Sequence, residues 1–142
     1  SVGSLFQRNS FDIDELTVVW QTINVEHHCE YCVTGHTAVA KLMSVDDQIV
    51  LALRNETPLP SERLEALRSF PQQMVRNRGR ATDEEINAFL SAGHTKQQVL
   101  ELILGSAHKV MSNYTNHIAN TPVDDMVKMF EWVKSDQRAV TN

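Results

Sequence analysis

The stretch from His27 to His36 reads His-His-Cys-Glu-Tyr-Cys-Val-Thr-Gly-His and contains both cysteines of the chain and three of its six histidines. Its spacing is Cys-x-x-Cys-x-x-x-His. The sequence from Thr34 to Met43 predicts a helix, and a helix that begins near Cys29 would carry Cys29, Cys32 and His36 at positions i, i+3 and i+7. At about 100° per residue these positions share one face, so we expect one imidazole beside a pair of thiols.

The spacing of Cys29 and Cys32 favours thiol redox chemistry. Residues three apart on a helix have Cα atoms about 5 Å apart, within the range that a disulfide spans. The first turn of a helix has unpaired N–H groups and a partial positive charge, which favour a thiolate and would act mainly on Cys29. His36, four residues after Cys32, could take its proton as a base or stabilise its thiolate as a cation. The residues offer two ways to activate the sulfurs and do not rank them.

Two other interpretations of the cysteine pair stay open. Cys-x-x-Cys also occurs as buried packing and as one half of a zinc site. Zinc is the stronger alternative, since His27, His28 and His36 could join the sulfurs as ligands. A structural zinc site usually takes ligand pairs from separate elements, however, and the chain has no second Cys-x-x-Cys and no His-x-x-x-His. We therefore expect a redox pair without a metal.

The run from Glu26 to Ala40, Glu-His-His-Cys-Glu-Tyr-Cys-Val-Thr-Gly-His-Thr-Ala-Val-Ala, resembles the signature of the alkylhydroperoxidase D and carboxymuconolactone decarboxylase superfamily. A second block, from Leu104-Gly105 through Ser112-Asn113-Tyr114-Thr115-Asn116-His117 to Ala119-Asn120-Thr121-Pro122, is similar to the C-terminal segment of the peroxidase-related branch. The resemblance extends from about Leu5 to Phe130, and it is specific because two separated blocks agree in order and spacing. It implies an all-α fold, a single-domain bundle of six to eight helices over residues 1–142, and assembly as a trimer or hexamer.

The resemblance also implies roles for individual residues. In peroxidase members of the superfamily the second cysteine attacks the peroxide, the first cysteine resolves it as a disulfide, and a Glu-His relay moves protons. Carried over to this chain, Cys32 is the peroxidatic cysteine, Cys29 the resolving cysteine and His36 the relay.

The chain departs from the family pattern at this relay. The position twelve residues before the first cysteine, commonly Glu in the family, is Thr17. Glu15 is the nearest preceding acid, although on a helix it points in a different direction from position 17, and Glu26 directly before the motif is another candidate. Alkylhydroperoxidase D has a histidine between its cysteines, where this chain has Tyr31, and a tyrosine hydroxyl is a poor proton shuttle at neutral pH. The thiol pair is therefore intact, while the identity of the acid is open.

Composition restricts the class of protein. A chain of 142 residues with 42% hydrophobic residues is expected to form one domain with a buried core. Its net charge of −5 and its pI of about 5.6 argue against a nucleic-acid partner. No apolar run approaches the roughly 20 residues that span a bilayer, and no signal-peptide pattern is recognised. Two closely spaced cysteines suit a cytoplasmic thiol pair better than a disulfide-stapled secreted scaffold.

Apolar periodicity and capping signals predict helices along the whole chain. Ser1 to Asn9 could be the end of a longer helix whose beginning is missing. The chain begins Ser-Val-Gly-Ser and not Met, as the edge of a trimmed protein would. In the first half of the chain we expect three helices: Phe11 to Val25, the cysteine helix from Glu26 to Met43, and Val45 to Arg54, which Ser44 caps. The next helix is capped by Ser61, kinked or restarted at Pro71 and ended by Gly79, and the one after it follows a capping box of Thr82 and Glu85 and is closed by Gly93. A capping box of Thr95 and Gln98 precedes the helix from Val99 to Asn120, and a last helix runs from Thr121-Pro122 through Trp132.

Several polar residues outside the motif have two interpretations. We expect the basic cluster of Arg76, Arg78 and Arg80 to be a solvated or subunit-facing surface rather than an anion site. We expect His94 in a surface loop and His108 half-buried in the core. The segment from Asn113 to His117 either makes hydrogen bonds at a helix end or lines the cysteine pocket, from this subunit or a neighbouring one. Together with the small residues Gly35 and Ala38, it is where we expect subunit contacts.

The sequence therefore predicts a thiol-dependent hydroperoxide reductase with an antioxidant role. It would reduce a small peroxide and would itself be reduced by a dithiol, which the resemblance suggests to be lipoyl-type or thioredoxin-like. No flavin, haem or nucleotide motif is present, so no cofactor is expected. The alternatives are a carboxymuconolactone decarboxylase-like lyase, which needs no redox cysteine pair, and a non-enzymatic thiol redox sensor or metal-binding protein.

Overall fold

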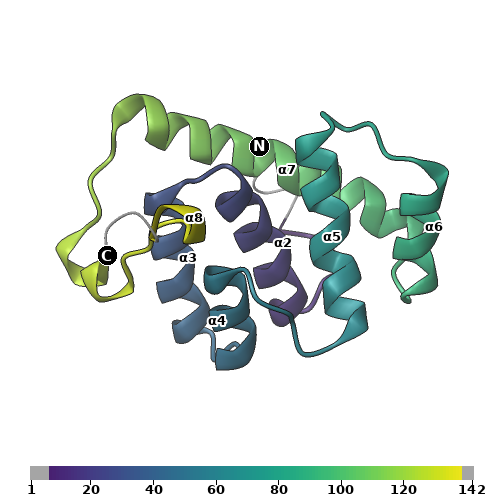
Figure 1. The fold of residues 1–142 in the computed structure, drawn as a ribbon, viewed down its shortest axis with the longest axis horizontal. Coiled ribbons are helices and arrows are strands. Elements are labelled where there is room, and N and C mark those ends of the chain that lie inside the picture. The colour runs from purple at the N-terminus through teal and green to yellow at the C-terminus, as the bar shows by residue number, and fades with distance from the viewer. Residues whose placement is uncertain (1–6, 139–142) are drawn as a thin grey trace.

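The computed structural model of the chain describes residues 7–138 (Figure 1). The regular structure within this range is entirely helical: α2 (Ile13–Glu26), α3 (Glu30–Leu42), α4 (Asp47–Asn55), α5 (Glu62–Arg76), α6 (Asp83–Ser91), α7 (Lys96–Ala119), the 3-10 helix η1 (Asp125–Phe130) and α8 (Ser135–Arg138). The predicted all-α fold of six to eight helices is confirmed.

Helix α2 lies at the centre of the fold and contacts α3, α4, α5 and α7. Its residues from Thr17 to Val25 are buried, except for the half-buried Trp20. Val18, Val19 and Ile23 join one large core cluster with residues of α4, α5, α6 and α7. Val25 at the end of α2 packs instead with Val33 of α3 and Trp132. These contacts fix the end of α2, and with it the point where the chain turns into the cysteine motif.

Helix α7 runs along the top of the view in Figure 1 and contacts α2, α3 and α5. Its buried residues recur every three or four positions and change in character along the helix: Gln98, Leu102, Gly105, Lys109 and Asn113. The N-terminal half of α7 therefore adds apolar side chains to the core, while its C-terminal half presents polar side chains toward α3.

Most predicted helix starts are confirmed. Ser61 caps α5, and the capping boxes at Thr82 and Thr95 begin α6 and α7. Helix α5 continues through Pro71 without ending. The predicted cap of α4 was wrong: Asp46, not Ser44, accepts the N–H of Gln48. Ser44 has a left-handed backbone with φ of 58°, so it belongs to the turn after α3 and not to the start of α4.

The predicted last helix from Thr121 to Trp132 was also wrong, because only the short η1 forms there. The reason is tertiary hydrogen bonding to the backbone. The guanidinium of Arg54 donates to the carbonyl oxygens of Phe130 and Glu131, each at 2.8 Å. In return, the indole N–H of Trp132 donates to the carbonyl oxygen of Arg54 at 2.7 Å. These bonds dock the segment on α4 in an irregular form, overriding its local helix signals.

His94 is buried, not exposed as its Gly-His-Thr context suggested. Its ring stacks on Phe89 with centroids 4.5 Å apart, and its Nε2 lies 2.9 Å from the carbonyl oxygen of Arg63. The aromatic contact and the partner of Nε2 offset part of the cost of burying the imidazole, whose Nδ1 makes no hydrogen bond to another described residue. His108 is half-buried, as expected.

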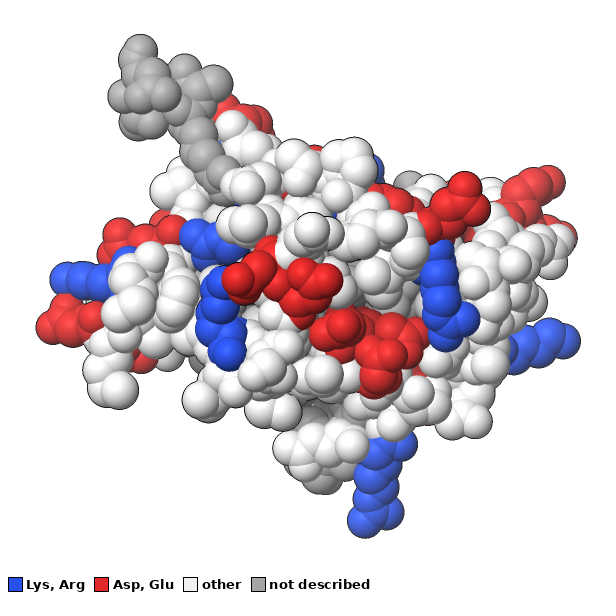
Figure 2. All heavy atoms as spheres, turned by 90° about the horizontal axis from the view of Figure 1, so that it is seen from below, with Lys and Arg blue, Asp and Glu red and all other residues white. Residues whose placement is uncertain are grey.

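Two sequence expectations concern the ends and the surface of the chain. Residues 1–6 of the predicted N-terminal helix lie outside the described residues, and residues 7–10 are not helical. No helix among residues 7–138 combines the length and the apolar character that crossing a bilayer requires. On the face drawn in Figure 2, acidic side chains gather in the middle, and Lys and Arg side chains lie around them.

Candidate active site

The cysteine motif begins in a tight turn between α2 and α3. Contrary to the predicted start of the cysteine helix at Glu26, that residue ends α2, and His28 reverses the chain with a left-handed φ of 54°. The N–H of Cys29 donates to the carbonyl oxygen of Asn24 at 3.0 Å. Cys29 is then the N-cap of α3, and its sulfur accepts the N–H of Cys32 at 3.3 Å. The first cysteine therefore occupies the N-terminal end of the helix.

Cys29 and Cys32 are joined as a disulfide, with Cα atoms 5.2 Å apart. Both residues are nearly inaccessible, with exposed fractions of 0% for Cys29 and 4% for Cys32. The spacing of three residues alone brings the two sulfurs together, so the disulfide closes within a single helical turn.

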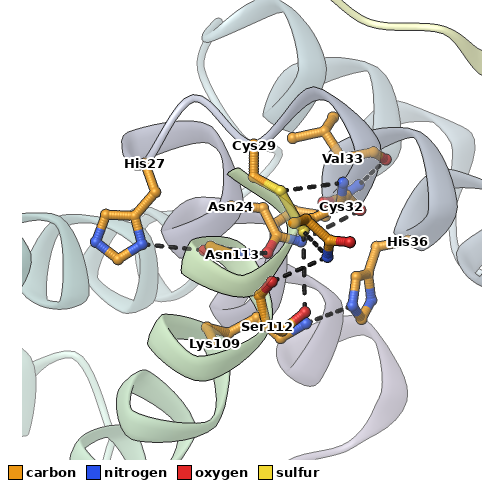
Figure 3. The surroundings of a disulfide bond; sticks show 11 residues. Asn24, His27, Cys29, Cys32, Val33, His36, Lys109, Ser112 and Asn113 are labelled. Atoms are coloured by element: carbon orange, nitrogen blue, oxygen red, sulfur yellow. Dashed lines mark hydrogen bonds between the residues drawn. A yellow bond between two sulfur atoms is a disulfide. The ribbon is translucent and has the colours of Figure 1, made fainter. Parts of the chain in front are cut away.

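Helix α7 supplies the polar surroundings of Cys32 (Figure 3). The side-chain amide of Asn116 donates to Cys32 Sγ at 3.4 Å, and Ser112 Oγ lies 3.9 Å from the same sulfur. These residues stand with Lys109 and Asn113 at positions i, i+3, i+4 and i+7, which is one face of the helix. Of the two interpretations of the segment from Asn113 to His117, Asn116 and His117 follow the second, because they line the pocket at the cysteines from within the same chain.

His36 lies beside Lys109, with Lys109 Nζ 2.5 Å from His36 Nε2. Only 2% of Lys109 is exposed, and burial lowers its pKa from 10.5 to about 8. Burial, followed by the charge of Lys109 and then by His108, lowers the pKa of His36 from 6.5 to about 3. An ammonium group can only donate, so His36 Nε2 accepts and the ring proton resides on Nδ1. His36 is therefore a neutral imidazole near pH 7, and within the described residues no hydrogen bond joins it to either sulfur.

A chain of buried hydrogen bonds runs behind the cysteines from α3 to the turn. Gln21 Nε2 donates to the carbonyl oxygen of Val33 at 3.1 Å, and Asn24 Nδ2 donates to Gln21 Oε1 at 3.0 Å. Asn113 Nδ2 donates to Asn24 Oδ1 at 2.8 Å, and Asn113 Oδ1 lies 3.0 Å from His27 Nδ1. Because an amide oxygen only accepts, His27 donates from Nδ1. This network connects three helices and fixes the orientation of the motif.

The candidate acids have partners elsewhere. Glu15, at the other end of α2, pairs with Arg63 at 3.1 Å and completes the capping box of α2. Glu26 accepts two hydrogen bonds from Arg76, at 2.5 and 3.1 Å. The hydroxyl of Thr17 donates to the carbonyl oxygen of Ile13. The roles of Glu15 and Glu26 stay predictions, and the structure brings neither carboxylate into hydrogen-bond contact with a sulfur or with His36.

A small pocket of about 220 Å³ opens over the first cysteine. Cys29, His28 and Tyr31 form one side of it, and Asn116 and His117 of α7 form the other. The hydroxyl of Tyr31 donates to Asp124 at 3.4 Å, at the segment that follows α7. Cys29 thus lines the pocket as a residue, although its exposed fraction is 0%, while Cys32 Sγ faces the side chains of α7.

The geometry offers little to a metal ion. Among residues 7–138, no three His, Cys, Asp or Glu side chains are grouped closely enough to hold one. His27 and His36, two of the histidines considered as zinc ligands, are engaged by Asn113 and Lys109.

Lys109 was not among the residues that the sequence predicted for the site, and of the two interpretations of Asn113 to His117 the sequence favoured neither clearly enough to identify the inward face of α7. A signal was present, since Lys109, Ser112, Asn113 and Asn116 form a polar stripe at helical spacing on one side of the helix. Such a stripe usually faces solvent. Only the tertiary packing of α7 against α3 reveals that this one is turned inward.

Comparison with protein-family models and with curated proteins finds no match. Among solved structures, the fold is similar to that of an uncharacterized peroxidase-related protein from Silicibacter sp. TM1040, with a TM-score of 0.73 and 16% sequence identity. The match covers 84% of this chain and 64% of the other. At this identity the likeness concerns the fold, and the predicted resemblance to peroxidase-related proteins is confirmed at that level.

Proposed function

We propose that the protein is a thiol-dependent hydroperoxide reductase whose reactive centre is the Cys29–Cys32 pair. The observation that carries the proposal is the hydrogen bond from Asn116 to Cys32 Sγ, which gives one sulfur of a readily closed pair a polar donor. A hydrogen bond to a thiolate favours the charged form, which is the nucleophile. The peroxidase-related fold supports the same class of activity.

In the proposed first step the Cys32 thiolate attacks one oxygen of the hydroperoxide. The O–O bond breaks, Cys32 becomes a sulfenic acid, and the leaving alkoxide takes up a proton to give the alcohol. Ser112 and Asn116 lie within reach of this sulfur and would donate hydrogen bonds to the peroxide oxygens or to the leaving group. The step therefore uses side chains of α7 that the spacing of the motif alone did not identify.

In the second step the Cys29 thiol condenses with the sulfenic acid, which forms the disulfide and releases water. A reducing dithiol, of the lipoyl or thioredoxin-like kind, then restores both thiols by exchange and is itself oxidised to a disulfide. The pocket beside Cys29 supports attack of that dithiol on Cys29 Sγ, which is buried in the oxidised form and would have to become accessible first. Cys32 would be the leaving sulfur, and its hydrogen bond from Asn116 would stabilise the departing thiolate.

We assign His36 the part of a neutral proton relay rather than that of a cation or a general base. Its pKa of about 3 leaves it uncharged at neutral pH, and Lys109 holds its Nε2. A proton on Lys109 can therefore pass to His36 only as another proton leaves the ring. Glu15 and Glu26 would enter this relay only after rearrangement of their ion pairs with Arg63 and Arg76.

We further propose that the protein acts as a cytoplasmic homo-oligomer, a trimer or hexamer. The outer face of α3 supports this, because Val39 and Leu42 are exposed and a Cβ added at Gly35 would meet no other atom within 4 Å. A second helix could therefore approach closely there, as the small residues Gly35 and Ala38 suggested.

The test of the proposed activity is peroxide consumption with a dithiol reductant by wild type and two single variants. Cys32→Ser should abolish turnover, whereas Cys29→Ser should consume about one peroxide per subunit and stop at the sulfenic acid. Asn142→Ser, at the last residue and outside the motif, is the matched control. Normal turnover by Cys32→Ser would exclude the proposed roles.

A further inference from the structure

A second and larger pocket lies between α5, α6 and α7, with a volume of about 610 Å³. Its walls are mostly apolar and include Met74 and Val75 of α5, Ile86 of α6, and Val99 and Val110 of α7. This volume is in the range of small-molecule sites, roughly 300–1,000 Å³. His27 contributes to its lining, and Asn113 stands between His27 and the disulfide (Figure 3). The pocket is therefore separate from the sulfurs.

One polar atom in this apolar wall lacks a partner. Ser106 Oγ, from the middle of α7, is buried and makes no hydrogen bond to another described residue. A buried hydroxyl without a partner costs free energy unless something else binds it. A ligand in the pocket could supply that partner.

The mouth of the pocket has an unpaired positive charge. Arg78 lines the pocket and also a neighbouring hollow of about 390 Å³ that it shares with Arg76, Asn77 and Arg80. Arg76 is paired with Glu26, but no salt bridge or side-chain hydrogen bond engages Arg78 or Arg80 within residues 7–138. Arg78 also has a left-handed φ of 54°, followed by Gly79 at 82°, which fixes its place at the rim. The pocket thus combines an apolar interior with a cationic edge.

We propose that this pocket binds an amphipathic carboxylate, a molecule with an alkyl chain and one carboxylate head. The chain fills the space between α5, α6 and α7, and the head pairs with Arg78, whose planar guanidinium matches a carboxylate. The sequence predicted a solvated or subunit-facing surface for the arginine cluster, because the adjoining cavity is not visible in the sequence. The proposal goes beyond the peroxide chemistry and does not depend on it.

Charge favours this occupant over a second copy of the chain. Exposed apolar residues of α7, Ile103 and Tyr114, also border the pocket, so a protein surface could cover it. A chain with a net charge of −5 would have to bring an acidic group to Arg78 and an apolar side chain into the cavity together. A single carboxylate on an alkyl chain satisfies both requirements, and the other occupant becomes an outcome of the test.

The experiment is calorimetric titration of the full chain with decanoate, decan-1-ol and decylamine, which share a chain and differ in charge. We expect saturable binding of one decanoate per subunit, roughly tenfold weaker binding of the alcohol, and no binding of the amine. Arg78→Gln should weaken decanoate binding about tenfold and leave that of the alcohol unchanged. Arg80→Gln, whose residue lines the outer hollow alone, is the control and should bind as wild type does.

A second variant tests the cavity independently of the charge. Ser106→Phe should fill the pocket and abolish binding of both decanoate and decanol, whereas Ala107→Phe, on the neighbouring exposed position of α7, should not. Equal binding of decanoate and decylamine would overturn the proposal, as would decanoate binding that survives Ser106→Phe. The proposal would also be overturned if wild type did not bind decanoate and the Ser106→Phe variant lost an oligomeric state that wild type has. That result would assign the pocket to subunit contact.

Discussion

Lys109 and His36 come from helices far apart in the sequence, yet the ammonium of Lys109 lies 2.5 Å from His36 Nε2 in the interior of the fold. Lys109 is buried, and no acidic side chain within residues 7–138 forms an ion pair with it. Its contact with the face of Trp20, at 5.8 Å from the ring centroid, is the other attraction on its charge. The hydrogen-bond partner of His36 in this structure is therefore a cation, whereas the resemblance implied a glutamate.

Replacement of Lys109 should change the titration of its partner. In Lys109→Met we expect the pKa of His36 to rise above about 3 but to stay below 6.5, because burial, the larger cause, persists. The chemical shift of the His36 ring proton, followed by NMR from pH 8 to pH 3, measures this. Lys96→Met, at the exposed start of α7, should leave the curve unaltered. An unaltered curve in Lys109→Met would mean that the ammonium does not act on His36.

The same substitution should stabilise the fold. A buried cation without an acidic partner is costly, and an apolar side chain of similar length removes that cost. We expect the free energy of unfolding at pH 7 to rise by about 1–3 kcal/mol in Lys109→Met. Urea denaturation measures the change. If Lys109→Met lost more stability than Lys96→Met, the contacts of Lys109 would stabilise the fold by more than the burial of its charge destabilises it.

Stability should depend on pH through His36. Its pKa is about 3 in the folded protein and 6.5 in the unfolded chain, so the unfolded chain binds a proton that the folded protein does not. The contribution is fully present above pH 6.5 and is lost as the pH falls from 6.5 toward 3. Over that window wild type should lose about 1.4 kcal/mol per pH unit more than His36→Asn. Parallel stability curves for the two proteins would contradict the low pKa.

Asn116 should govern the reactivity of Cys32. Asn116→Ala removes the donor to Cys32 Sγ, so the thiolate loses a hydrogen bond worth about 1 kcal/mol or somewhat more. We expect alkylation of the reduced protein at pH 7 to slow by roughly three- to tenfold. Thr115→Ala, on an exposed face of the same helix, is the matched control. Equal alkylation rates in the two variants would remove Asn116 from the site.

The buried amides should act as a unit. Asn113→Leu leaves Asn24 Oδ1 and His27 Nδ1 without a partner, and we expect it to lower the free energy of unfolding by about 2–4 kcal/mol. Asn24→Leu should cost a similar amount, and the double variant should cost clearly less than the sum of the two. Simple additivity in denaturant unfolding would contradict a connected network.

The sequence predicted the fold well where helix signals were local. Ser61, Thr82 and Thr95 each begin a helix, because a side-chain cap and the residues it serves lie within four positions. The segment after Pro122 failed for the opposite reason. Its backbone accepts hydrogen bonds from Arg54, and its Trp132 donates to the carbonyl oxygen of Arg54, in each case across more than 70 residues, so no local pattern announces these contacts.

The site was predictable in part for the same reason. Cys29 and Cys32 meet through one turn of backbone, so their spacing sufficed to bring them together. Lys109 reaches His36 across 73 residues and Asn116 reaches Cys32 across 84, and both contacts depend on how α7 packs. Glu15 was a candidate acid because it is the acidic residue nearest to position 17 in the sequence. It lies, however, at the end of α2 away from the cysteines, where it pairs with Arg63.

The central claim is that Cys29 and Cys32 form a reversible redox pair that reacts with peroxide. The most direct test is intact mass together with a thiol titration of the fully reduced protein after one equivalent of an organic hydroperoxide. The account predicts loss of two thiols and about two mass units per subunit, reversed by a dithiol. Two thiols that stay reduced after the peroxide is added would contradict it.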